Sequence, residues 1–177
     1  MKKIFILVDY QKDFVDGVLG FLKAMELDKK IAKRVHQAYE NNEAVICTMD
    51  THYANYLDTQ EGKNLPVPHC LDKTLGWEVY GETGKALNNP IYVKKVTFGG
   101  IGLKEVLEGL EVEDVEIELC GVITNMCVIS TAVICKSILP EAKIIINAEL
   151  CASFNDELHD QALNVMESMQ MQIIGRN

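Results

Sequence analysis

The chain has 177 residues, 48% of them hydrophobic and 24% charged, and its formal net charge at pH 7 is −9. This length and apolar content suffice for one core without disulfides, and they exclude the collagen-like, fibrous and disordered classes. The acidic balance argues against a nucleic acid or an anionic membrane as partner, because binding either needs a surplus of Lys and Arg. We expect one domain over residues 1–177 that binds a small molecule, and the sequence leaves open whether copies form a homo-oligomer.

The N-terminal apolar run is short and the cysteines show no paired spacing. The run covers residues 4–8 and ends at Asp9, which is too short for a secretory signal, and no stretch approaches the roughly 18 apolar residues of a membrane span. The six cysteines include no CxxC pair. We therefore expect a cytoplasmic protein with reduced thiols.

Short β-branched runs alternate with helical patterns along the chain. The helical patterns cover residues 26–41, 103–110 and 128–138, and a fourth helix begins near residue 155. Strands are predicted at residues 3–9, 43–50, 90–96, 115–121, 142–148 and 171–175. The alternation predicts an α/β fold, a three-layer α/β/α sandwich around a mostly parallel central sheet.

Residues 51–83 break this rhythm, since neither a strand nor a helix period is clear there. The segment holds His52, His69, two of the four prolines and the single tryptophan. An insertion of this length inside a compact domain is usually functional or disordered. Its aromatic and ligand-type residues favour a loop insertion that carries a metal site.

Polar residues stand where the predicted strands end. Asp9, Asp50 and Lys95 close the first three strands, and Cys127 follows the fourth. Ligands of open α/β sheets bind beyond the carboxyl ends of the strands. A carboxylate, an ammonium and a thiol at this edge are the components of an activated cysteine nucleophile. We expect the helix N-terminus and the lysine to lower the pKa of Cys127; the alternatives are a buried structural cysteine and an Asp9 that only caps a turn.

A second set of residues has the composition of a metal site. In Asp50-Thr51-His52, alternate residues project to the same side of an extended segment, and Glu61 and His69 follow in the insertion. This mixed oxygen and nitrogen set suits Zn²⁺, Fe²⁺ or Mn²⁺, although a D-x-H pattern is also common without a metal. His36 and His159, which fall on predicted helices, are interpreted as ordinary surface or partly satisfied residues.

Several separated motifs occur in an order that resembles one known family. They are DYQKDF at 9–14, DTH at 50–52, NLPVPHC at 64–70, LGWE at 75–78, KVTFGG at 95–100 and CGVITNMCV at 120–128. Together they resemble the isochorismatase-like cysteine hydrolases, nearest to the nicotinamidase/pyrazinamidase branch, and the resemblance runs over nearly the whole chain. It implies the isochorismatase-like hydrolase fold.

The resemblance also implies three catalytic residues. Asp9 matches the general base, Lys95 the electrostatic partner and Cys127 the nucleophile of the family. Lys95 matches better than Lys94 because it stands three residues before Phe98, the spacing of the family pattern.

The family further implies features of the substrate pocket. A cis peptide is expected at Val122-Ile123, where it would direct the backbone amides of Ile123 and Cys127 at an oxyanion. Phe14 is a candidate wall of the pocket. The aromatic residue that often stacks on a pyridine ring before the Pro-His motif is replaced here by the region of residues 66–67.

For the metal, the family match covers Asp50, His52 and His69. Glu61 stands where some nicotinamidases place a carboxylate ligand, whereas others have a histidine near the position of Asp58. The implied cofactor is a divalent cation, with Zn²⁺ preferred over Fe²⁺ or Mn²⁺.

The activity implied by the resemblance is hydrolysis of nicotinamide, or a related aromatic carboxamide, to the acid and ammonia through a thioester on Cys127. One alternative is a cysteine amidohydrolase that acts on an N-carbamoyl or ureido substrate. Another is a binding protein that keeps the fold without catalysis. Isochorismatases proper lack the nucleophilic cysteine, so Cys127 argues against that reaction.

Overall fold

The computed structural model describes residues 1–110 and 114–176. Within these ranges the strands form one six-stranded sheet in the order β3-β2-β1-β4-β5-β6, and every neighbouring pair is parallel. The strands are Lys2–Val8 (β1), Ala44–Asp50 (β2), Ile91–Lys95 (β3), Val115–Val122 (β4), Lys143–Ala152 (β5) and Gln172–Ile174 (β6). The prediction of a parallel central sheet is confirmed.

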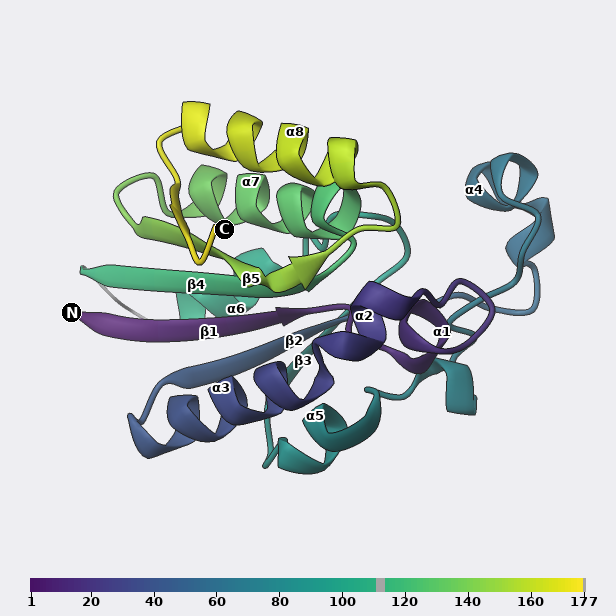
Figure 1. Cartoon of the computed structure of the whole chain (residues 1–177), viewed down its shortest axis with the longest axis horizontal. Coiled ribbons are helices and arrows are strands. Elements are labelled where there is room, and N and C mark those ends of the chain that lie inside the picture. The colour runs from purple at the N-terminus through teal and green to yellow at the C-terminus, as the bar shows by residue number, and fades with distance from the viewer. Residues whose placement is uncertain (111–113, 177) are drawn as a thin grey trace.

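Helices cover both faces of this sheet. Those of the described ranges are Lys12–Val15 (α1), Leu22–Glu26 (α2), Asp28–Glu40 (α3), Gln60–Asn64 (α4), Gly81–Ala86 (α5), Leu103–Gly109 (α6), Ile129–Ile138 (α7) and Asp156–Ser168 (α8). Helices α3 and α5 pack on one face, and α6, α7 and α8 lie on the other (Figure 1). The predicted three-layer α/β/α sandwich is therefore confirmed.

The central strand β1 lies in the middle of the core. From Ile4 to Val8 every side chain of β1 is buried, because β2 and β4 flank the strand and helices cover it on both faces. This explains the continuous apolar run, which differs from the alternation of a half-exposed strand. Phe5 is fully buried there, and truncating it to alanine would cost about 3–5 kcal/mol of stability.

Some predicted boundaries differ from the observed ones. The expected helix over residues 26–41 corresponds to α3, which begins at Asp28, and the separate short helix α2 ends just before it at Glu26. Strand β5 extends to Ala152, and its pairing with β4 shifts register between Leu119 and Gly121. Helix α1 is a single turn, too short to produce a periodic pattern.

The insertion over residues 51–83 holds short elements and lies beyond the carboxyl ends of the strands. Besides α4 and α5 it contains 3₁₀ turns at Tyr56–Asp58 and Leu75–Trp77. Helix α4 projects past the ends of β1 and β2 at the right of Figure 1. In residues 1–110 and 114–176, no helix combines the length and the apolar character needed to cross a bilayer.

Candidate active site

Asp9 follows β1 and turns the chain sharply. Its φ is 46°, in the left-handed region that aspartate tolerates better than most residues. The carboxylate is fully buried, and its Oδ1 accepts a 2.6 Å hydrogen bond from the hydroxyl of Thr48 on β2. A strained backbone that holds a buried carboxylate is typical of functional sites.

Lys95, the last residue of β3, reaches the same point from two strands away. Its Nζ lies 2.6 Å from Oδ2 of Asp9 and 3.4 Å from Oδ1 of Asp50. It also lies 3.6 Å from Sγ of Cys127 and donates to the Thr97 carbonyl. The ammonium therefore joins the three groups that the sequence placed at this edge of the sheet.

Cys127 lies in the turn Thr124–Val128, which has π-helical hydrogen bonding and leads into α7. The expected cis peptide at Val122-Ile123 is present just before it. The amides of Met126 and Val128 both donate to the carbonyl of Ile123. The turn over residues 124–128 is called the nucleophile turn after the role expected for Cys127, and the backbone amide of Cys127 lies between the amides of Met126 and Val128 in the chain.

Gly121 brings Asp9 close to the turn that carries Cys127. Its φ is +121°, and a Cβ built there would come 2.1 Å from the carbonyl oxygen of Val8. A side chain does not fit, because the backbone of β4 touches that of β1 one residue before Asp9.

The expected lowering of the Cys127 pKa is wrong. Burial raises the pKa of the Cys127 thiol well above its usual value, and the negative charges of Asp9 and Asp50 raise it further, against the opposite effect of Lys95. The sequence placed both carboxylates at this edge of the sheet, but the expectation weighed only the helix N-terminus and the lysine and left out the opposing effects of burial and of the two carboxylates on the thiol pKa. The raised pKa favours the thiol over the thiolate, so Cys127 would need a base in order to act as a nucleophile.

Asp9 is suited to accept that proton. Burial raises its pKa above the usual value for aspartate, the Lys95 charge opposes this, and the Asp50 charge adds to it. Burial works against the charge of Lys95, but the neighbouring Asp9, Cys127 and Asp50 outweigh burial and raise the pKa of the ammonium. A stronger carboxylate base therefore lies beside a cation that stays charged.

The four predicted metal ligands come together next to this group. Asp50, His52, Glu61 and His69 each offer one ligand atom, and these atoms all lie within 4.8 Å of one another. The Nε2 atoms of the two histidines lie 2.9 and 3.4 Å from Oδ2 of Asp50, and 3.6 and 3.7 Å from Oε1 of Glu61. Asp58 does not belong to this cluster of the described residues.

The chemistry of the cluster fits a divalent cation. Nδ1 of His69 lies 2.8 Å from the Val67 carbonyl, and donating its hydrogen there leaves Nε2 of the neutral ring with a lone pair directed at two carboxylates. Burial raises the pKa of Asp50, but the neighbouring His52, His69 and Lys95 outweigh burial and hold that pKa below its usual range. A cation such as Zn²⁺, Fe²⁺ or Mn²⁺ would satisfy all four donors.

A largely apolar cavity of about 560 Å³ opens onto both groups. Cys127, Ile123, Asp50, Glu61 and His69 contribute to its wall. Phe14 also lines it, and its ring packs against that of His69 with centroids 5.4 Å apart. Each residue that the sequence analysis placed near a substrate therefore borders this space or contacts a residue that does.

Sequence reasoning missed several residues that shape the site. Gln11 is fully buried; its Nε2 donates to the carbonyl of Asp50 and its Oε1 accepts from the amide of the same residue. Phe21, Phe98 and Phe154 line the cavity. The place of Gln11 inside the DYQKDF motif was a usable signal for it. The three phenylalanines lie on separate loops with no shared spacing.

The isochorismatase domain matches residues 3–177, which is almost the entire chain. The chain belongs to the isochorismatase domain family. It is also similar to an uncharacterized isochorismatase family protein, PncA, of Bacillus subtilis strain 168, with 29% identity over 176 residues and 93% of each chain covered.

Solved structures confirm the fold. The nicotinamidase/pyrazinamidase PncA from Bacillus subtilis superposes with a TM-score of 0.86 at 29% identity, covering 98% of this chain and 99% of that one. The pyrazinamidase/nicotinamidase from Streptococcus mutans UA159 gives a TM-score of 0.85 at 27% identity, covering 98% and 100%. The resemblance inferred from the motifs is thereby confirmed at the level of family and fold.

Proposed function

We propose that this protein is a cysteine amidohydrolase that converts nicotinamide, or a closely related aromatic carboxamide, to the acid and ammonia. One observation carries the proposal. The Lys95 ammonium lies 2.6 Å from the Asp9 carboxylate and 3.6 Å from the Cys127 sulfur, and the sulfur borders an apolar cavity. The likeness to nicotinamidases supports the choice of substrate.

In the first half of the reaction the thiol becomes an acyl carrier. Asp9 accepts the proton of Cys127 while the sulfur attacks the carboxamide carbon, and the charge of Lys95 stabilises the developing thiolate. The amides of Ile123 and Cys127 donate to the oxygen that becomes negative. Asp9 then returns the proton to the nitrogen, the carbon–nitrogen bond breaks, and ammonia leaves a thioester on Cys127.

In the second half a water molecule restores the enzyme. Asp9, again a carboxylate, accepts a proton from the water as its oxygen adds to the thioester carbon. The carbon–sulfur bond breaks, the carboxylic acid is released, and the proton returns to the sulfur of Cys127. The sum is one amide and one water giving one acid and one ammonia.

Asp50, His52, Glu61 and His69 would hold a divalent cation at the edge of the same cavity. When bound, such a cation supplies a Lewis acid that polarises or orients a polar ligand atom. The chain itself holds Asp50 for this role, because Gln11 hydrogen-bonds both backbone groups of that residue.

The wall of the cavity favours an aromatic substrate. Phe14, Phe21, Phe98 and Phe154 contribute to its wall, and aromatic rings favour edge or offset contacts with a flat heterocycle. They supply the aromatic surface that the region before the Pro-His motif lacks.

The test is ammonia release from nicotinamide, pyrazinamide and an N-carbamoyl compound. We expect turnover of the two aromatic amides and its loss in Cys127→Ala. The matched control is Cys135→Ala, the same change at a buried cysteine of α7 outside the cavity. Full activity of Cys127→Ala would refute the mechanism, preference for the N-carbamoyl compound would change the substrate class, and inactivity on all three would favour a binding role.

A further inference from the structure

The nucleophile turn has two faces. Ile123 before it, together with Met126 and Cys127, lines the cavity. Thr124 and Asn125 instead make side-chain hydrogen bonds to the junction of β5 and α8. The residues that line the cavity therefore flank two residues whose side chains are hydrogen-bonded to another part of the fold.

The first of these bonds comes from the end of β5. The Ser153 hydroxyl donates a 2.7 Å hydrogen bond to Oδ1 of Asn125, and it accepts one from the amide of Asn155. Ser153 is buried, and the Asn155 side chain caps the first turn of α8 by accepting from Leu158. The contact to the nucleophile turn is thus fixed to the start of α8.

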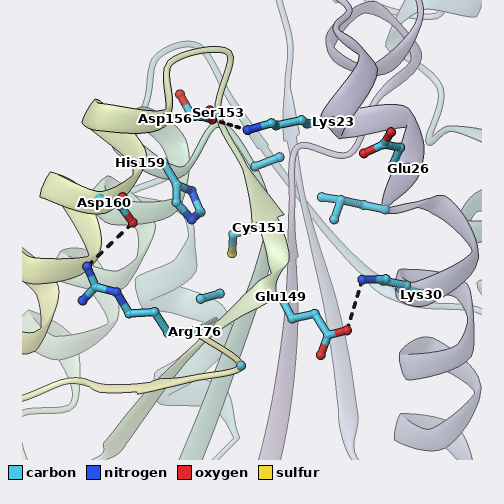
Figure 2. A pocket seen from close by; sticks show the side chains of 14 residues that line it. Lys23, Glu26, Lys30, Glu149, Cys151, Ser153, Asp156, His159, Asp160 and Arg176 are labelled. Atoms are coloured by element: carbon cyan, nitrogen blue, oxygen red, sulfur yellow. Dashed lines mark hydrogen bonds and ion pairs between the residues drawn. The ribbon is translucent and has the colours of Figure 1, made fainter.

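The second bond comes from one helical turn further along α8. Nδ1 of His159 lies 2.8 Å from Oγ1 of Thr124, which is fully buried. Figure 2 shows the His159 ring projecting from α8 toward the end of β5, in a hollow of about 460 Å³. His159 and Ser153 line this hollow, whereas Met126 and Cys127 line the larger cavity.

The cationic side chains around this hollow already have partners. Lys23 pairs with Asp156, Lys30 with Glu149 and Arg176 with Asp160 (Figure 2). The hollow's three cations are therefore engaged with its own carboxylates. Two contacts lead from the hollow to the nucleophile turn, His159 to Thr124 and Ser153 to Asn125.

We infer that His159 and Ser153 are positioning residues that hold the nucleophile turn so that the sulfur of Cys127 meets Asp9 and Lys95. This role rests on the proposed function, because it assumes that Cys127 is the nucleophile. The turn has backbone hydrogen bonds but no side-chain cap of its own among the described contacts, so these two bonds from outside add the side-chain support that the turn lacks.

Small displacements matter at such a site. The sulfur lies 3.6 Å from Lys95, and a shift of about 1 Å in a reacting group can lower the rate about 100-fold. The positioning bonds do not touch the substrate side of the turn. Their loss should therefore lower kcat more than it raises KM.

The experiment compares His159→Leu with His159→Asn. Leucine removes the hydrogen bond, whereas the asparagine amide can replace Nδ1; burial lowers the pKa of His159, so a neutral amide is a suitable mimic. Gln161→Leu is the matched control, since that exposed residue of α8 contacts only Glu157 among the side-chain bonds of the described chain. Ser153→Ala tests the other bond.

We expect His159→Leu to lower kcat about 10- to 100-fold with KM changed less than about twofold, as for a misplaced reacting group. His159→Asn should recover most of the loss, and Gln161→Leu should behave as wild type. The second-order rate of Cys127 alkylation by iodoacetamide, read on its peptide by mass spectrometry, should fall in parallel in His159→Leu. Thermal denaturation of every variant shows whether a loss of kcat follows a loss of folding.

Unchanged kcat and labelling in His159→Leu would overturn the inference, as would equal losses in the leucine and asparagine variants. Activity that survives Cys127→Ala would instead overturn the proposed function. If the wild type hydrolyses none of the amides, the labelling rate of Cys127 still decides whether His159 positions the sulfur.

Discussion

Lys95 and Asp9 form a buried ion pair, with Nζ 2.6 Å from Oδ2, although their strands β3 and β1 are separated by β2. Both side chains are almost completely shielded from solvent. The pair therefore links two strands that are not neighbours, and it does so beside Cys127, the proposed nucleophile.

Replacing Lys95 by methionine should destabilise the fold. The change leaves a buried carboxylate without its cation, and breaking one partner of a buried pair costs about 3–5 kcal/mol. The double variant Asp9→Asn/Lys95→Met should recover much of the free energy of unfolding in urea, because no charge of the pair is left. A double variant less stable than Lys95→Met alone would contradict this account.

Replacing Asp9 by asparagine should separate thiol acidity from catalysis. The Asp9 charge raises the pKa of Cys127, so its removal lowers that pKa and the thiolate forms at lower pH. Turnover should nevertheless be lost, because the base is gone. The ultraviolet absorbance of the thiolate, measured against pH with Cys127→Ala as the blank, checks this prediction. An unchanged titration, or retained turnover, would refute it.

The acid limb of the pH profile should follow Asp9. Its pKa is raised above the usual aspartate value by burial, and the base form is lost as pH falls through that raised pKa. The Thr48 hydrogen bond lowers the same pKa, so Thr48→Val should move the acid limb of kcat/KM to higher pH. The control is Thr83→Val, which removes a buried hydroxyl that donates a hydrogen bond to the backbone carbonyl of Asp28. It should leave the acid limb in place.

Adding Zn²⁺ should stabilise the protein through the four-residue cluster. A ligand that binds only the folded state raises stability by about 2.7 kcal/mol at 100 times its Kd, so the Tm of chelator-treated protein should rise on addition of zinc. The double variant His52→Ala/His69→Ala should show no such rise, whereas Glu40→Gln, an exposed change at the end of α3, should respond as wild type. Equal shifts in all three proteins would indicate binding elsewhere.

The Arg34 network should matter for stability and not for catalysis. Arg34 donates to Glu43 and Glu118 at 2.6 and 2.7 Å and packs over the Phe5 ring, which ties α3 to the sheet. Arg34→Met leaves two largely buried carboxylates unpaired and should cost about 3 kcal/mol in urea unfolding. KM should stay unchanged, since none of these residues borders the cavity, and Lys33→Met on the same helix should cost little.

Sequence reasoning predicted the sheet because its strands are buried on both faces and therefore read as continuous apolar runs. It also predicted the meeting of Asp9, Lys95 and Cys127, since the carboxyl ends of parallel strands share one edge. Burial across the sheet was not visible, so the direction of the Cys127 pKa shift was wrong. Short helices such as α4 carry no periodic signal.

The contacts behind the nucleophile turn show a second limit. His159 and Thr124 are 35 residues apart in the chain, and neither residue type nor spacing indicates that they meet. The interpretation of His159 as a partly satisfied helical residue agrees with its hydrogen bond. The partner of that bond emerged only from the packing of α8 on the turn.

The two halves of the cavity have different supports. Asp9, Lys95 and Cys127 lie on or beside strand ends, where Gly121 closely approaches Val8. Glu61 and several phenylalanines lie instead on loops and short helices between the strands. Mutations that reshape the outer half can accumulate without moving the reacting atoms. Selection can therefore change which amide binds while the residues proposed to break the bond stay the same, so new substrate preferences can evolve on this fold.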